Sequence, residues 1–141
     1  MTQLEEVSVL LVDDEVDFVS TLTKRMDKRG LKTSSVNSGE DALEFLGQHL
    51  MDVVILDVKM PGIGGIQTLR EIKKRYPLTE VIMLTGHANV EVAIQGMEVG
   101  AFDYLMKPMA IDDLVYKIQD ACKKKSIQEK KIKERLLNSP G

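Results

Sequence analysis

Several features are scarce or missing in this chain of 141 residues, and each absence excludes a class of protein. The single cysteine, Cys122, rules out an internal disulfide framework, and the sequence holds no cysteine and histidine cluster with the spacing of a metal site. No apolar run approaches the ~20 residues that a membrane-spanning helix requires. The first residues are acidic, whereas a secretory signal begins basic and then turns apolar. We therefore expect a soluble, cytoplasmic protein that does not contact a membrane.

An excess of positive charge is also missing. The net charge is −3 at pH 7, which argues against a general nucleic-acid binder. Hydrophobic residues make up 43% of the chain, which at this length is enough for one globular domain to bury a core.

The most informative stretch is residues 53–62. Its first four residues are apolar and mostly β-branched, which predicts a strand buried on both faces, as is typical of parallel sheets. Asp57 follows at the C-terminal end of this strand, and Pro61 and Gly62 then predict a loop. Ligands bind outside the carboxyl ends of the strands in an open parallel sheet. Taken alone, Asp57 is equally well interpreted as a cap for the next helix.

The rest of the chain alternates between strand patterns and helix patterns. The predicted strands cover residues 8–12, 31–36, 53–56, 81–84 and 102–106. The predicted helices have apolar residues at Val16, Val19, Leu22 and Met26; Ala42, Leu43, Phe45 and Leu46; Ile66, Leu69 and Ile72; Val90, Ala93, Ile94 and Met97; and Ile111, Leu114, Val115 and Ile118. Ser38 with Asp41 resembles a capping box at the start of the second helix.

Five strands that alternate with five helices predict an α/β fold. The expected architecture is a doubly wound, five-stranded parallel sheet with helices on both faces. The second strand is the most polar of the five, which suits an edge of the sheet.

Polar side chains stand at four of the five predicted strand ends. Asp13 and Asp14 follow the first strand, Asp57 the third, Thr85 the fourth and Lys107 the fifth. Each of them has an ordinary structural explanation, such as a turn carboxylate, a capping threonine or a solvated lysine. Their coincidence at one edge of a parallel sheet instead favours a convergent binding site.

At these residues the chain closely resembles the receiver domains of bacterial two-component response regulators. The resemblance covers residues from about 7 to 123, and the motifs occur in family order. The matching motifs are Asp13 with Asp14, residues 56–62, residues 84–86 and residues 104–108. The resemblance implies a flavodoxin-like strand order 2-1-3-4-5, which places Asp14 and Asp57 across the crevice at the topological switch point.

Three neighbouring carboxylates repel one another unless a cation is bound between them. Mg²⁺ prefers such oxygen ligands, usually one or two carboxylates with water. We expect Asp14, Asp57 and the main-chain carbonyl of Lys59 to bind the ion directly, and Asp13 to act through water. With its charge screened, Asp57 is the expected phosphoacceptor, which forms an aspartyl phosphate.

The resemblance implies roles for the other motif residues. Lys107 would bring a positive charge to the phosphoryl oxygens, and the Lys107–Pro108 peptide bond would be cis. The Thr85 hydroxyl and the main-chain N–H groups of Lys59 and Gly86 would donate hydrogen bonds to the phosphoryl group. For Thr85 a simple helix cap remains an alternative.

Tyr104 stands where the family has a switch aromatic, and a plain strand tyrosine is the alternative interpretation. Thr85 and Tyr104 are then a two-state element that phosphorylation biases. The resemblance implies a sensor histidine kinase or a phosphotransfer protein as partner. It also implies an output face on the last two helices and the last strand, through which a phosphorylation-dependent homodimer could form.

The C-terminal residues depart from a minimal receiver. We expect a receiver domain at residues 7–123 and a basic helical extension or linker at residues 124–141. Ile118, Cys122, Ile132 and Leu136 share one helical face, which Lys125 and Glu129 interrupt. A solvated extension, a dimerisation helix and a linker to a further domain all remain open.

Two other functions remain as alternatives. An Mg²⁺-dependent phosphatase with an aspartate nucleophile would share the fold class, but it needs a second acid two residues after the nucleophile, where this chain has Lys59. The other alternative is a receiver-like interaction module that is never phosphorylated. Such a module would not need the acidic residues, and it would not need Thr85 or Lys107 either, so their presence argues against it. We therefore expect no enzymatic activity beyond the chain's own phosphorylation and dephosphorylation.

Overall fold

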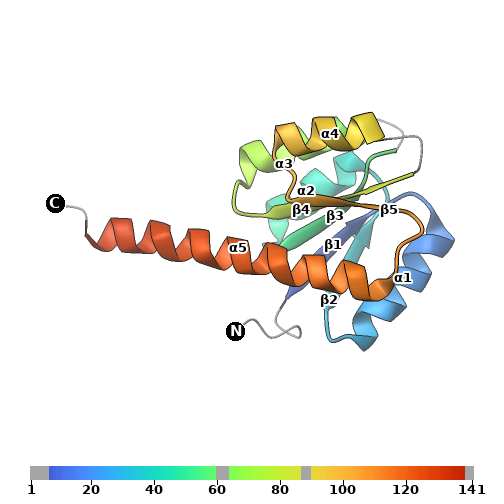
Figure 1. Cartoon of the computed structure of the whole chain (residues 1–141), viewed down its shortest axis with the longest axis horizontal. Coiled ribbons are helices and arrows are strands. Elements are labelled where there is room, and N and C mark those ends of the chain that lie inside the picture. The colour runs from blue at the N-terminus through green and yellow to red at the C-terminus, as the bar shows by residue number, and fades with distance from the viewer. Residues whose placement is uncertain (1–6, 60–63, 87–89, 139–141) are drawn as a thin grey trace.

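The computed structural model describes residues 7–59, 64–86 and 90–138 (Figure 1). A five-stranded parallel sheet has the order β2-β1-β3-β4-β5, so the predicted fold class and strand order are confirmed. The strands are β1 (Ser8–Val12), β2 (Lys32–Val36), β3 (Val53–Asp57), β4 (Glu80–Thr85) and β5 (Asp103–Met106). The helices are α1 (Val16–Lys28), α2 (Gly39–Gln48), α3 (Gly64–Arg75), α4 (Val90–Val99) and α5 (Ile111–Leu137). The loop predicted from Pro61 and Gly62 lies outside the described residues.

The central strands are buried on both faces because helices cover each side of the sheet (Figure 1). Val9 and Leu11 of β1 pack with α1 and α5, whereas Leu10 and Val12 pack with α2 and α3. This alternation follows from the two-residue period of a strand. Because both faces of the central strands are covered, β1, β3 and β4 consist mainly of consecutive apolar residues. The polar strand β2 lies at an edge of the sheet, as predicted.

Helix α4 packs differently from the sequence expectation. Three of its four predicted apolar positions are substantially exposed: Val90 at 51%, Ile94 at 56% and Met97 at 39%. The buried positions are the small residues Ala93 and Gly96. A Cβ atom on Gly96 would lie 2.1 Å from the Met83 sulfur, so the close approach of this helix to β4 turns the larger side chains outward.

Close packing of α3 against the chain after β3 depends on Gly65. A Cβ atom at this position would lie 2.4 Å from Cα of Val58 and 2.8 Å from its carbonyl oxygen. Val58 directly follows Asp57, so this contact fixes the backbone beside the strand end.

We expect Gly65→Ala to destabilise the fold by about 1–3 kcal/mol, the usual cost of overpacking, because backbone atoms must move. Urea unfolding measures the change. Gly47→Ala in α2 is the matched control, since its Cβ atom would meet only the Tyr76 hydroxyl at 3.5 Å. That substitution should stabilise α2 by about 0.5–1 kcal/mol through helix propensity. Equal effects of the two substitutions would contradict the packing explanation.

Helix α5 is continuous from the sheet into a projecting arm (Figure 1). Lys124 pairs with the fully buried Glu80 at 3.0 Å, and Lys125 pairs with Asp52 at 3.2 Å. Beyond these ion pairs, Ile132 is 46% exposed and Leu136 is 73% exposed. Among the helices of the described ranges, this one included, none combines the length and the apolar character needed to cross a membrane.

Candidate functional site

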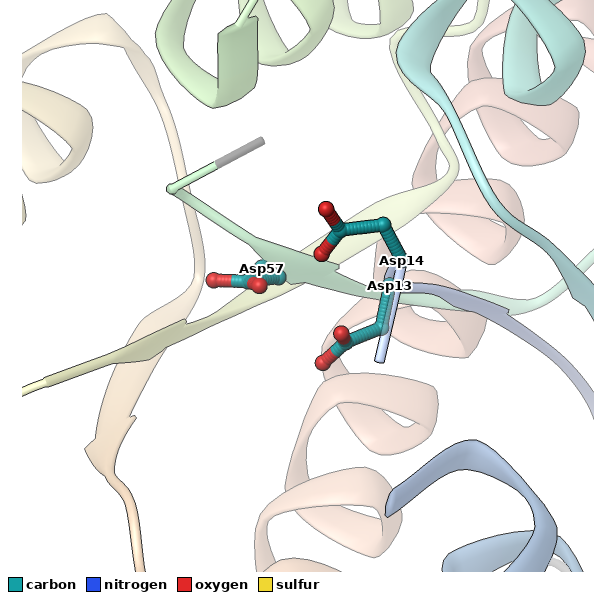
Figure 2. Close-up of side chains that lie close together, drawn as sticks. All are labelled: Asp13, Asp14 and Asp57. Carbon is teal, nitrogen blue, oxygen red and sulfur yellow. The ribbon is translucent and has the colours of Figure 1, made fainter. Parts of the chain in front are cut away.

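Three carboxylates converge at the C-terminal edge of the sheet. Asp13 and Asp14 follow β1, and Asp57 ends the neighbouring strand β3, where Val12 is in register with Leu56. One oxygen from each carboxylate lies within 4.8 Å of the other two. Figure 2 shows Asp14 and Asp57 from the two strand ends with Asp13 beside them. The sequence predicted this meeting because parallel strands end at a common edge.

The three carboxylates differ in burial. Asp13 is 1% exposed and Asp57 is 5% exposed, whereas Asp14 is exposed to solvent. Burial raises the pKa of Asp57 above its ordinary value, although the hydrogen bond from the Lys59 main-chain N–H opposes the increase. That bond reaches Oδ1 of Asp57 at 3.0 Å. A buried carboxylate that is unfavourably charged is a good candidate for a functional group.

Lys107 reaches this cluster from the end of β5. Its ammonium nitrogen lies 2.7 Å from Oδ2 of Asp13 and 3.6 Å from Oδ2 of Asp57. Burial acts to lower the pKa of Lys107, but the hydrogen bonds that it donates to Asp13 and Glu15, together with the attraction of the Asp57 and Asp13 charges, outweigh burial and raise this pKa. The Lys107–Pro108 peptide bond is cis, and the Lys107 main-chain N–H donates to the Thr85 carbonyl at 2.8 Å.

The other predicted residues lie at the same edge or near it. Thr85 ends β4 and is 2% exposed, and Gly86 follows it, half-buried. Lys59 is exposed, two residues after Asp57. Tyr104 on β5 pairs with Met83 on β4, whereas Thr85 pairs with Met106, two residues further along both strands. The Tyr104 side chain is 38% exposed. Tyr104 therefore does not belong to the carboxylate cluster.

Two residues that contact Lys107 were missed by the sequence analysis. Oε1 of Glu15 lies 3.1 Å from the Lys107 ammonium nitrogen, which also sits 4.2 Å from the centre of the Phe18 ring. Glu15 directly follows the acidic pair, which is a weak local signal. Nothing local connects either residue with a lysine about ninety positions away.

The donor set at this edge fits a hard divalent cation. All three candidate side chains offer carboxylate oxygens, which Mg²⁺ and Ca²⁺ prefer. Both oxygens of Asp13 already accept hydrogen bonds, Oδ1 from the Glu15 main-chain N–H at 2.9 Å and Oδ2 from Lys107. Asp14 and Asp57 are therefore better suited to direct metal contact, and Asp13 to contact through water.

Comparison with known proteins agrees with this arrangement. The sequence profile of the response regulator receiver domain matches residues 9–119. The chain is 34% identical over 117 residues to the transcriptional regulatory protein ZraR of Escherichia coli K12, covering 83% of this chain and 26% of that protein. It is 35% identical over 113 residues to the DNA-binding transcriptional regulator NtrC of the same strain, covering 80% of this chain and 24% of that protein. The chain thus spans about a quarter of these relatives.

Solved structures show the same fold. A response regulator receiver domain protein from Clostridium thermocellum superposes with a TM-score of 0.84 at 35% identity, over 86% of this chain and 98% of that chain. NtrX from Brucella abortus also has a TM-score of 0.84, at 29% identity, over 91% of this chain and 29% of that chain. From its sequence profile, its strand order and its cluster of aspartates, the chain belongs to the family of response regulator receiver domains.

Proposed function

We propose that this chain is a cytoplasmic phosphoacceptor in which Asp57 receives a phosphoryl group from a sensor histidine kinase or a phosphotransfer protein. Receiver domains of two-component response regulators are phosphorylated by such proteins. The observation that carries the assignment to Asp57 is its position: a carboxylate 5% exposed at the end of β3, with the Lys107 ammonium 3.6 Å away. A buried carboxylate beside a fixed positive charge is suited to attack phosphorus and to tolerate the charge that develops.

Receiver domains bind Mg²⁺ at an acidic pocket, and we infer that Asp14, Asp57 and the Lys59 main-chain carbonyl hold it here, with Asp13 acting through water. When bound, the ion neutralises the charge of the carboxylates and of the incoming phosphoryl oxygens. Asp13 has a second role in this proposal, because its hydrogen bond at 2.7 Å positions Lys107.

The chain's own residues then position the reacting groups. An oxygen of Asp57 forms the new bond to phosphorus, and the bond from phosphorus to the donor nitrogen breaks. The donor imidazole, protonated on its other ring nitrogen, leaves with that electron pair as a neutral group. Lys107, the Thr85 hydroxyl and the main-chain N–H groups of Lys59 and Gly86 contact the phosphoryl oxygens. Phosphoryl transfer needs little beyond such placement and charge neutralisation.

Mass spectrometry tests the assignment directly. After incubation with acetyl phosphate and Mg²⁺, the chain should gain the mass of one phosphoryl group, and peptide analysis should locate it on Asp57. A label on any other residue would overturn the proposal.

Sustained phosphatase activity is the competing function, and the position of Lys59 argues against it. The second acid that such an enzyme needs to protonate the leaving group is replaced by an exposed lysine. We therefore infer that the chain catalyses only its own phosphorylation and dephosphorylation. An aryl phosphate should be hydrolysed no faster than in buffer, whereas steady release of phosphate would favour the phosphatase.

We further propose that the output face lies on α4, β5 and α5, with residues 7–123 as the signalling domain and residues 124–141 as a helical extension. Exposed apolar side chains support this surface, since Ile94 and Tyr116 are 56% and 65% exposed. Phosphorylation would then favour a homodimer or a partner at this face.

Thr85→Ala should leave Asp57 able to accept a phosphoryl group but weaken the response of the output face. The hydroxyl is the group that would move toward the phosphoryl oxygens, and coupling energies in such switches are about 1–3 kcal/mol. Sedimentation of phosphorylated and unphosphorylated protein measures the response, with Thr79→Ala, directly before the start of β4, as control. A normal response in Thr85→Ala would exclude this residue as the relay.

A further inference from the structure

The Lys107 ammonium is held by more groups than phosphoryl binding requires. Besides Asp13 and Asp57, it contacts the Glu15 carboxylate at 3.1 Å and the face of the Phe18 ring at 4.2 Å. Asp57 is the most distant of its three carboxylate partners, at 3.6 Å. The ammonium therefore lies closer to the carboxylates of Asp13 and Glu15 than to Asp57, the residue that it would serve.

We propose that Glu15 is a positioning residue that holds Lys107 in this resting place and thereby competes with a phosphoryl group on Asp57 for the ammonium. This inference rests on the proposed function of Asp57.

The local structure leaves the Glu15 side chain available for this contact. Glu15 is the N-cap residue of α1, yet its side chain makes no capping hydrogen bond in the described structure. Its main-chain N–H instead donates to Oδ1 of Asp13 at 2.9 Å. The backbone of Glu15 and the carboxylate of Asp13 are thus fixed together, and both carboxylates point to the same lysine.

Phe18, about one helical turn after Glu15 on α1, provides a further contact for the Lys107 ammonium. Its ring lies beneath the ammonium, where a cation is attracted to the aromatic face. Two residues at the start of one helix therefore contact the Lys107 ammonium in addition to the aspartates.

The two carboxylates that hold Lys107 are not equivalent. The Asp13 side chain is fully buried, so its contact with Lys107 is hard to replace by water, whereas the Glu15 side chain is 63% exposed. Glu15 is the partner that Lys107 can exchange most easily for phosphoryl oxygens. Because an exposed ion pair contributes little, removing it should strengthen phosphoryl binding by only about two- to fivefold.

The test is binding of a beryllium fluoride complex, a non-covalent analogue of the phosphoryl group, measured by calorimetry with saturating Mg²⁺. Glu15→Gln should bind it about two- to fivefold more tightly than the natural chain. Asp17→Asn is the matched control: it removes the same charge two residues away, and Asp17 makes no ion pair within the described part of the chain. It should bind like the natural chain.

A second measurement reports on Lys107 itself in the metal-free protein. The NMR signal of the Lys107 ammonium should shift in Glu15→Gln and stay in place in Asp17→Asn, which a merely structural role of Glu15 would not produce.

The possible outcomes distinguish a failure of the Glu15 role from a failure of the proposed function of Asp57. If the natural chain binds beryllium fluoride but Glu15→Gln and Asp17→Asn bind it equally well, Glu15 has no positioning role, and the proposed function stands. If the natural chain does not bind the analogue at all, both proposals fall.

Discussion

Asp57→Asn should abolish phosphoryl transfer to this chain and leave the fold intact. The amide has the shape of the carboxylate but is a poor nucleophile, so no aspartyl phosphate can form at this position. The side-chain oxygen that asparagine retains can still accept the hydrogen bond from the Lys59 main-chain N–H. Mass spectrometry after incubation with acetyl phosphate and Mg²⁺ should show full labelling of the natural chain and no labelling of the variant.

Asp27→Asn provides a control for the loss of a charge, because Asp27 lies exposed at the far end of α1. This variant should be labelled like the natural chain. Labelling of Asp57→Asn in full yield at another residue would show that the acceptor has been misassigned.

The same substitution should change the pH dependence of stability without metal. The pKa of Asp57 is raised in the folded state, mainly by burial, so the folded chain binds this proton more readily than the unfolded chain. The stability that Asp57 contributes is therefore fully present below the ordinary pKa of 3.8 and is lost as the pH rises through the folded-state pKa. Asp57→Asn lacks this loss, so its free energy of unfolding should exceed that of the natural chain at neutral pH. Urea unfolding in EDTA across this range measures the difference.

The parts of the fold that could be predicted from sequence are those where local pattern and burial agree. β3 is read correctly because residues 53–56 are apolar and the strand is covered on both faces. The capping of α2 by Ser38 was also predicted, and its hydroxyl accepts from the Asp41 main-chain N–H at 3.1 Å. In both cases the interactions that decide the structure lie within a few residues of one another.

The features that the sequence did not predict depend on contacts between residues that are far apart in the chain. The outward turn of Ile94 and Met97 depends on how closely Gly96 approaches Met83 on a different element, which helical periodicity cannot report. The contacts of Glu15 and Phe18 with Lys107 depend on which strand ends are neighbours in the sheet.

The candidate site could be predicted from the sequence in part. Its acidic residues could be predicted to meet, because parallel strands bring their C-terminal ends to one edge whatever the details of packing. Their unequal burial could not be predicted, since Asp13 and Asp14 are adjacent in sequence while one is buried and the other exposed. That difference arises because Asp13 accepts hydrogen bonds from Glu15 and Lys107, which turn its carboxylate into the protein. Because of this difference in burial and hydrogen bonding, we expect Asp14 to bind a metal ion directly and Asp13 to contact it through water.

Asp14→Ala should therefore remove the stabilisation of the folded chain by Mg²⁺. An ion that binds only the folded state adds RT ln(1 + [Mg²⁺]/Kd) to the free energy of unfolding, about 1 kcal/mol at roughly five times Kd and about 2.7 kcal/mol at ~100 times Kd. For a chain of this length, each kcal/mol corresponds to a rise of about 3–5 °C in Tm. The natural chain should show this rise between EDTA and Mg²⁺, whereas Asp14→Ala should show almost none.

The metal-free variant should show a second, smaller effect of the opposite sign. Removing one of three carboxylates whose oxygens lie within 4.8 Å of one another relieves repulsion, so Tm in EDTA should rise. Because Asp14 is exposed and Lys107 already offsets the charges of Asp13 and Asp57, the gain should stay below about 1 kcal/mol. Asp17→Ala, which removes an exposed charge outside the cluster, should keep the full Mg²⁺ response. An unchanged Mg²⁺ response in Asp14→Ala would exclude Asp14 as a ligand, whatever its place beside Asp57 suggests.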